Sequence, residues 1–256
     1  EEQIDIIPIQ AETKEPEVSR TSKVLALSFG RTLTTLASII FGMVAARLLS
    51  KHDYATMRQT MLAYSFVAPL LMLGLPDALY YFLPREQNRK RGVLIDCLVL
   101  ICIMALVFSI FLVAGGYKLL ALRFNNPDLA QTLKWMIPYP LYVMPAGVLG
   151  AVLLTQNKTF LLAKYNVISS LLLTVLTITG VVITRTYTGP LLAQIYFPAL
   201  LLPVVLWLSF RNVPGKISRP DIKNMKEMVK YAVPLGLAGM LGTLMLETNK
   251  VIVSAM

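Results

Sequence analysis

The first long apolar run, residues 24–49, limits what this chain can fold into more than any other feature. It reads VLALSFGRTLTTLASIIFGMVAARLL and carries Arg31 in its interior. At a rise of 1.5 Å per residue, a helix of this length crosses a hydrocarbon layer of about 30 Å. Six further runs of the same character follow along the chain. Because every backbone polar group in lipid must be satisfied within its own segment, we expect each run to be a helix.

The composition indicates the same class of protein. Hydrophobic residues make up 56% of the 256 positions, charged residues only 15%, and the mean hydropathy is +0.65. Soluble domains hold about 25% charged residues, so these values indicate a polytopic membrane protein. The formal net charge is +10, but the basic residues cluster in short links between the apolar runs. Such clusters indicate topology, and we expect no nucleic-acid partner.

The positions of the runs predict an all-α integral membrane protein, a polytopic helical bundle with seven spans. The expected spans cover residues 24–49, 57–84, 93–117, 135–155, 160–183, 190–210 and the segment from 228 onward. The expected domains are a polar tail over 1–22, a six-helix transmembrane lobe over 23–210, a basic linker over 211–227 and the first helix of an incomplete second lobe over 228–256.

The chain stops inside an apolar run, and we therefore expect it to be a fragment of a longer protein. A weak internal repeat at a shift of 206 residues agrees with two lobes, since it aligns Ala26 with Ala232 and Gly30 with Gly236. Six spans form one lobe, so we expect residues 1–256 alone not to transport.

The distribution of lysine and arginine over the links predicts the orientation. The second, fourth and sixth links hold twelve such residues, and the first, third and fifth hold seven. The positive-inside rule then places the N-terminus and the links 84–92, 155–164 and 211–227 in the cytoplasm.

Three segments in a fixed order carry a resemblance to a known family. They are ARLLSKHDYATMRQ after the first run, LGLPDALYYFLPRE closing the second and KYAVPLGLAGMLG opening the seventh. Over residues 21–256 the chain resembles Wzx-type polysaccharide-unit flippases of the multidrug/oligosaccharidyl-lipid/polysaccharide exporter superfamily. One departure is Ala55, where the family commonly has glycine.

The resemblance implies 12 to 14 helices in two lobes around a central cavity, in the bacterial cytoplasmic (inner) membrane. It implies a transporter, not an enzyme, that moves undecaprenyl-pyrophosphate-linked oligosaccharide units to the outer leaflet by alternating access. The expected partners are this lipid-linked oligosaccharide, membrane lipids and other polysaccharide-assembly proteins. No bound cofactor is expected, although coupling to Na⁺ or H⁺ is common in the superfamily.

A pyrophosphate head group needs cationic partners at membrane depth, and Arg31 is the foremost candidate for substrate binding. Lys250 and Arg58 are further candidates, while Asp77 and Glu247 are candidates for ion coupling or ion pairing. Each has a structural alternative. Arg31 could snorkel to the interface, Glu247 and Lys250 could neutralise each other at a spacing of three, Asp77 could be hydrated, and Arg58 could be an interfacial anchor.

Arg31 and Asp77 each lie eight residues, roughly 12 Å, from the cytoplasmic end of their spans. Consecutive helices are commonly adjacent, so we hypothesise that the two charges pair. The Gly74–Leu75–Pro76 break beside Asp77 would let this segment move, and Arg31 would alternate between Asp77 and the substrate pyrophosphate. The structural alternative is a permanent ion pair that only holds the helices together.

The remaining residue types restrict the chemistry further. Cys97 and Cys102 lie five apart in one run, too far round a helix to form a disulfide, and His52 is the only histidine. We therefore expect no metal site and no histidine-based catalytic dyad. Four tyrosines near the span ends are expected in the interfacial belt: Tyr80, Tyr81, Tyr139 and Tyr142.

Three alternatives remain at the level of sequence. A drug or organic-cation exporter of the same superfamily would favour an acidic, aromatic cavity. A membrane polymerase or ligase acting on glycolipids would need acids or histidines in an outer loop, whereas the link 118–134 offers only Asp128. A non-transporting scaffold would be favoured if the chain ended naturally near Met256.

Overall fold

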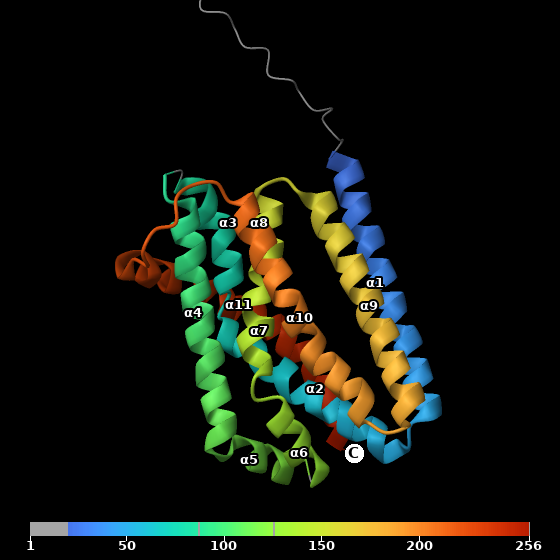
Figure 1. Cartoon of the computed structure of the whole chain (residues 1–256). Coiled ribbons are helices and arrows are strands. Elements are labelled where there is room, and N and C mark those ends of the chain that lie inside the picture. The colour runs from blue at the N-terminus through green and yellow to red at the C-terminus, as the bar shows by residue number, and fades with distance from the viewer. Residues whose placement is uncertain (1–19, 87, 125, 256) are drawn as a thin grey trace, which may run out of the picture.

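A computed structural model describes the backbone of residues 20–86, 88–124 and 126–255, and the side chains of residues 21–239 apart from 87 and 125. Within these ranges every regular element is a helix, which confirms the all-α class. Most helices run roughly along one direction, and α5 and α6 cross one end of the bundle (Figure 1). The helices are α1 (Arg20–Leu48), α2 (Lys51–Met72), α3 (Leu75–Arg85), α4 (Lys90–Phe111), η1 (Leu112–Gly116), α5 (Tyr117–Arg123), α6 (Asp128–Trp135), α7 (Tyr139–Ala146), α8 (Val148–Thr155), α9 (Thr159–Thr184), α10 (Thr188–Asn212) and α11 (Ile222–Ala255).

Five helical stretches in the described part are long and apolar enough to cross a membrane. They are Thr21–Leu48, Lys51–Arg85, Lys90–Arg123, Thr159–Thr184 and Thr188–Asn212. The bent unit of α6 with α7 and α8, which turns by 57°, adds a sixth if it is one span. The chain is thus a multi-pass helical membrane protein, and the first six predicted spans each correspond to one of these units. The seventh lies in α11, where residues 240–255 are described by their backbone alone.

Three predicted links contain helix. The first link is short because α2 begins at Lys51, where the Ser50 hydroxyl accepts a hydrogen bond from the Asp53 backbone N–H at 3.0 Å. This side-chain cap satisfies a backbone donor that the first helical turn leaves unpaired. The polar link 118–134 contains α5 and α6, and α11 begins at Ile222, inside the predicted linker 211–227.

The predicted break between α2 and α3 is present. Leu73 and Gly74 have left-handed backbone angles, with φ of 45° and 71°, and Pro76 stands in the first turn of α3. The fully buried core residues lie mainly on α3, α4 and α8. They include Leu79 and Leu83 of α3 and Ile101 of α4.

Two of the four tyrosines pack against other parts of the bundle. Tyr142 is buried, and its hydroxyl donates to the Ile195 carbonyl at 2.6 Å. Tyr139 packs edge-on against both Tyr64 and Tyr142, with ring centroids 4.7 and 5.7 Å apart. An aromatic ring with a polar hydroxyl suits the interior of a bundle as well as an interface once the hydroxyl has a partner, as that of Tyr142 does.

The links divide between the two ends of the bundle as predicted. The start of α1, the link between α3 and α4, the link between α8 and α9 and the end of α10 lie at one end (Figure 1). The links after α1 and after α9 lie at the other end, together with α5 and α6. We refer to the first as the basic end, because it carries the lysine- and arginine-rich links.

Candidate functional site

Helix α1 has three sides of different character: one packs against α9, one is apolar and exposed, and one is polar and exposed. Its packed side rests on α9, where Ala37 and Ala45 are buried and Gly30 faces Ala163. A second side is apolar and exposed, as in a helix that contacts lipid. It carries Phe29, Leu36, Ile39, Ile40 and Met43.

The third side of α1 is a polar stripe, defined as Ser28, Arg31, Thr35 and Ser38. These residues recur at intervals of three and four, so they share one helix face, and all four are exposed. The hydroxyls of Thr35 and Ser38 donate to the carbonyls of Arg31 and Thr34 in the same helix, which leaves the guanidinium as the strongest uncommitted donor group. A charged and hydroxylated face on a membrane helix typically borders protein or a water-filled cavity, not lipid.

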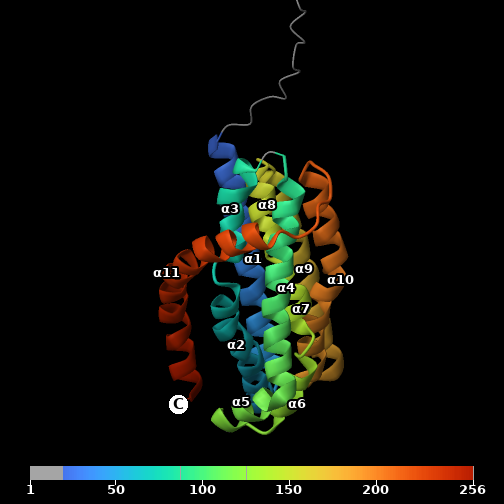
Figure 2. The same cartoon turned by 90° about the vertical axis from the view of Figure 1, so that its left-hand side faces the viewer.

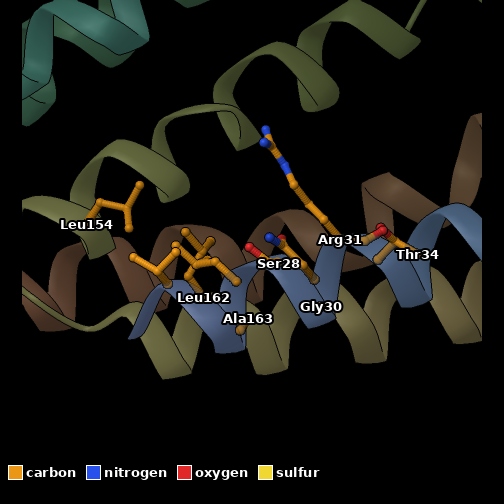
Figure 3. A pocket seen from close by; sticks show the side chains of 10 residues that line it. Ser28, Gly30, Arg31, Thr34, Leu154, Leu162 and Ala163 are labelled. Carbon is orange, nitrogen blue, oxygen red and sulfur yellow. The ribbon is translucent and has the colours of Figure 1, made fainter. Parts of the chain in front are cut away.

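Ser28 and Arg31 of this stripe border a cavity of about 670 Å³ at the basic end of the bundle. Helices α9 and α10 lie close together at the opposite end and separate towards the basic end (Figure 1). Figure 3 shows the Arg31 side chain extended away from the α1 axis at this cavity. The lining residues are Val24, Leu27, Ser28, Gly30, Arg31 and Thr34 of α1, Leu154 of α8, and Leu162, Ala163 and Asn166 of α9.

Arg31 and Asp77 do not form an ion pair in this conformation. Among the described residues, the ion pairs are His52 with Asp128 and Arg89 with both Asp96 and Asp221. Asp77 is exposed in the first turn of α3, where a carboxylate interacts favourably with the helix dipole. The alternation of Arg31 between Asp77 and substrate stays a hypothesis that this one conformation leaves open.

The other predicted site residues do not join Arg31 at the cavity. Arg58 lies near the start of α2, at the opposite end of the bundle from the cavity. Its guanidinium donates to the Tyr54 hydroxyl at 3.1 Å and lies 5.3 Å from the centre of that ring. Glu247 and Lys250 fall in the part of α11 whose side chains lie outside the described residues.

The sequence reasoning missed Asp96, whose carboxylate is completely buried near the start of α4. It accepts hydrogen bonds from Arg89 at 3.0 Å, from the Asp221 backbone N–H at 2.9 Å and from the Asn224 side chain at 2.7 Å. These contacts fasten the 213–221 segment and the start of α11 to α4. An acid inside the apolar run 93–117 was the available signal, by the same rule that singled out Arg31.

A comparison with family models identifies the class of protein. Residues 21–256 match the model described as polysaccharide biosynthesis protein. The chain belongs to this family. No curated protein and no solved structure matches the chain. As a polysaccharide biosynthesis protein that crosses a membrane several times, it takes part in the synthesis or export of polysaccharide.

The chemistry available at the cavity of this polysaccharide biosynthesis protein is that of binding. Arg31 supplies a permanent cation with five donors, and Ser28, Thr34 and Asn166 add neutral polar groups. No acid lines the cavity among the described residues. The described part of the chain also holds no group of three histidine, cysteine or acidic residues placed to bind a metal ion, and Cys97 and Cys102 are free thiols.

Proposed function

We propose that this protein translocates lipid-linked oligosaccharide units, of the undecaprenyl-pyrophosphate type, across the membrane for polysaccharide biosynthesis. The observation that carries the proposal is Arg31, an exposed arginine at a cavity of about 670 Å³ that has no ion-pair partner among the described residues. Membership of the polysaccharide biosynthesis family supports the class of substrate.

Arginine suits a pyrophosphate because its planar guanidinium presents parallel N–H groups to two oxygens at once. The apolar lining from Leu27, Leu154 and Leu162 lowers the local dielectric, which strengthens the attraction between the guanidinium and an anion. A sugar attached to the head group would meet the hydroxyls of the polar stripe. The site therefore favours an anionic amphiphile with a polar extension.

The alternatives receive less support from the described residues. An exporter of organic cations would need acids at the cavity, and the described lining supplies none. An enzyme acting on glycolipids would need a general acid or base beside the substrate, and the lining offers no such group. We therefore assign the protein a transport function and no catalytic residues.

In this proposal the protein works in the bacterial inner membrane with its basic end in the cytoplasm. The cavity lies at that end, where a unit assembled in the cytoplasm would first be bound. Arg58 at the opposite end would contact the substrate on release, and Asp77 would respond to a Na⁺ or H⁺ gradient. Other polysaccharide-assembly proteins would supply and remove the substrate.

Substitution of Arg31 tests the proposal. Arg31→Ala should lower polysaccharide export in a deletion strain at least about tenfold, since one charge-assisted bond is worth about 1.5–3 kcal/mol. Arg31→Lys should retain part of the activity because the charge remains. Arg47→Ala, at an exposed arginine in the last turn of the same helix, is the matched control and should export normally. Wild-type export by Arg31→Ala at equal protein abundance would refute the proposed role.

A further inference from the structure

The first turns of α11 lie across the bundle, nearly perpendicular to the spans, before the helix turns to run along them (Figure 2). This part of α11 and the segment before it carry a cationic surface, defined as Lys216, Arg219, Lys223, Lys226 and Lys230. All five side chains are exposed, and none forms an ion pair with another described residue. Within the described residues, the charges of this cationic surface are therefore not neutralised by ion pairs.

Helical spacing directs the lysines away from the protein. Lys223, Lys226 and Lys230 recur at intervals of three and four and share one face of α11. Met228 and Ala232 are completely buried on the opposite face, against the bundle. Glu227 shares the lysine face but leaves it with an excess of positive charge.

Two further acids near this surface, Asp96 and Asp221, already have partners. Asp96 is buried under Arg89, the Asp221 N–H and Asn224, and Asp221 lies 3.6 Å from Arg89. Arg89 also donates to the Arg219 carbonyl at 2.9 Å. The backbone that carries the cations is therefore held in one place, which lowers the ordering entropy that a ligand would have to overcome.

Aromatic residues place the cationic surface at the depth of lipid head groups. Tyr231, next to Lys230, stacks on Tyr81 at 4.5 Å, and Arg85 at the end of α3 lies over the Tyr81 ring at 3.9 Å. Trp207 is 56% exposed near the end of α10, with Arg211 4.8 Å from its ring. Aromatic rings and arginines of this kind form the belt at a membrane–water interface.

We propose that the cationic surface binds the phosphodiester head groups of anionic phospholipids in the leaflet at the basic end. The exposed Ile217 and Ile222, 75% and 71% accessible, supply apolar side chains that enter the acyl boundary beside those head groups. This site is separate from the Arg31 cavity and does not depend on the transport proposal. Its ligand is bulk anionic lipid, not the transported unit.

Lipid titration of the purified, delipidated full chain in a neutral detergent tests this proposal. Phosphatidylglycerol should raise the temperature of thermal unfolding of the wild-type protein, and phosphatidylcholine should not. The triple variant K223Q/K226Q/K230Q should need about tenfold or more phosphatidylglycerol for the same rise, because each cation near an anionic surface strengthens binding. K223R/K226R/K230R should respond like the wild type, since its charges are kept.

A charge-matched control separates this site from a general effect of positive charge. R47Q/K51Q/R123Q removes three exposed cations from the opposite end of the bundle and should respond like the wild type. An undiminished rise in K223Q/K226Q/K230Q would overturn the proposal. An equal rise with phosphatidylcholine, or with inorganic phosphate at the same concentration, would also overturn it, because the site would then not recognise anionic lipid.

Discussion

Asp96 illustrates what a single buried charge does in this protein. Its carboxylate is withdrawn from water, and Arg89, Asn224 and the Asp221 N–H compensate for the lost hydration. Arg91 supports the same region, since its guanidinium donates to the Val213 carbonyl at 2.8 Å. A buried ion pair of this kind contributes little net stability, but the removal of one partner is severe.

We predict that Asp96→Ala destabilises the protein by roughly 3 kcal/mol, because Arg89 and two amide donors lose their acceptor together. Asp96→Asn should be intermediate, since the amide keeps one acceptor oxygen. Thermal unfolding in detergent measures both effects. An Asp96→Ala variant that unfolds at the wild-type temperature would show that the cluster does not hold the start of α11.

For Arg31 and Asp77, the sequence predicts the depth of each residue in the membrane but not the distance between them. Their depth along the membrane normal follows from residue counting, because the helical rise is fixed. Their lateral separation depends on which faces of α1 and α3 oppose each other, and the local sequence does not specify this. Arg31 lines a cavity, its role in substrate binding stays a prediction, and the expected ion pair with Asp77 is not formed in this conformation.

At the scale of elements, α11 packs closely against the bundle at the break between α2 and α3. A Cβ added to Gly74 would lie 2.9 Å from the Gly236 nitrogen and 3.0 Å from the Ala232 carbonyl oxygen. A Cβ added to Gly236 would overlap the Leu73 carbonyl. Small residues allow such a backbone approach between membrane helices.

We predict that Gly236→Ala destabilises the protein by about 1–3 kcal/mol, because the added methyl group must push backbone against backbone. Gly150→Ala in α8 is the matched control, since a Cβ there meets no atom within 4 Å. This control should be neutral or stabilising by up to about 1 kcal/mol, as alanine favours a helix. Equal unfolding temperatures for Gly236→Ala and Gly150→Ala would contradict the close approach.

The elements that the sequence predicted well are those that the bilayer dictates. Long apolar runs have no alternative to a spanning helix, so α1, α9 and α10 were placed within a few residues. The shorter α5 and α6 were missed because helices of seven and eight residues are too short to span a membrane, and each carries charged side chains. Their place at the end of the bundle is set by packing, as in the bond between Thr132 and Thr60 at 2.7 Å.

For the molecule as a whole, the grouping of the links was predictable because lysine and arginine counts differ between the two ends of the bundle. Lys158 donates to the Asn212 side chain at 2.6 Å, and Arg89 and Arg91 hold the segment after α10. Several basic residues of that end thus bind the chain itself. The exposed ones, among them Lys216, carry the excess positive charge from which the positive-inside rule predicts a cytoplasmic position for this end.

Thiol labelling therefore provides a direct test of the orientation. In a Cys102→Ser background, with Cys97 buried, single substitutions Lys216→Cys and Arg123→Cys place an exposed thiol at each end of the bundle. A membrane-impermeant thiol reagent added to intact cells should label the Arg123→Cys variant, and the Lys216→Cys variant only after lysis. Both should react fully in detergent, which controls for local access. Labelling of Lys216→Cys in intact cells would show that the orientation is the opposite of the one proposed. The Arg31 cavity would then take up its ligand from outside the cell.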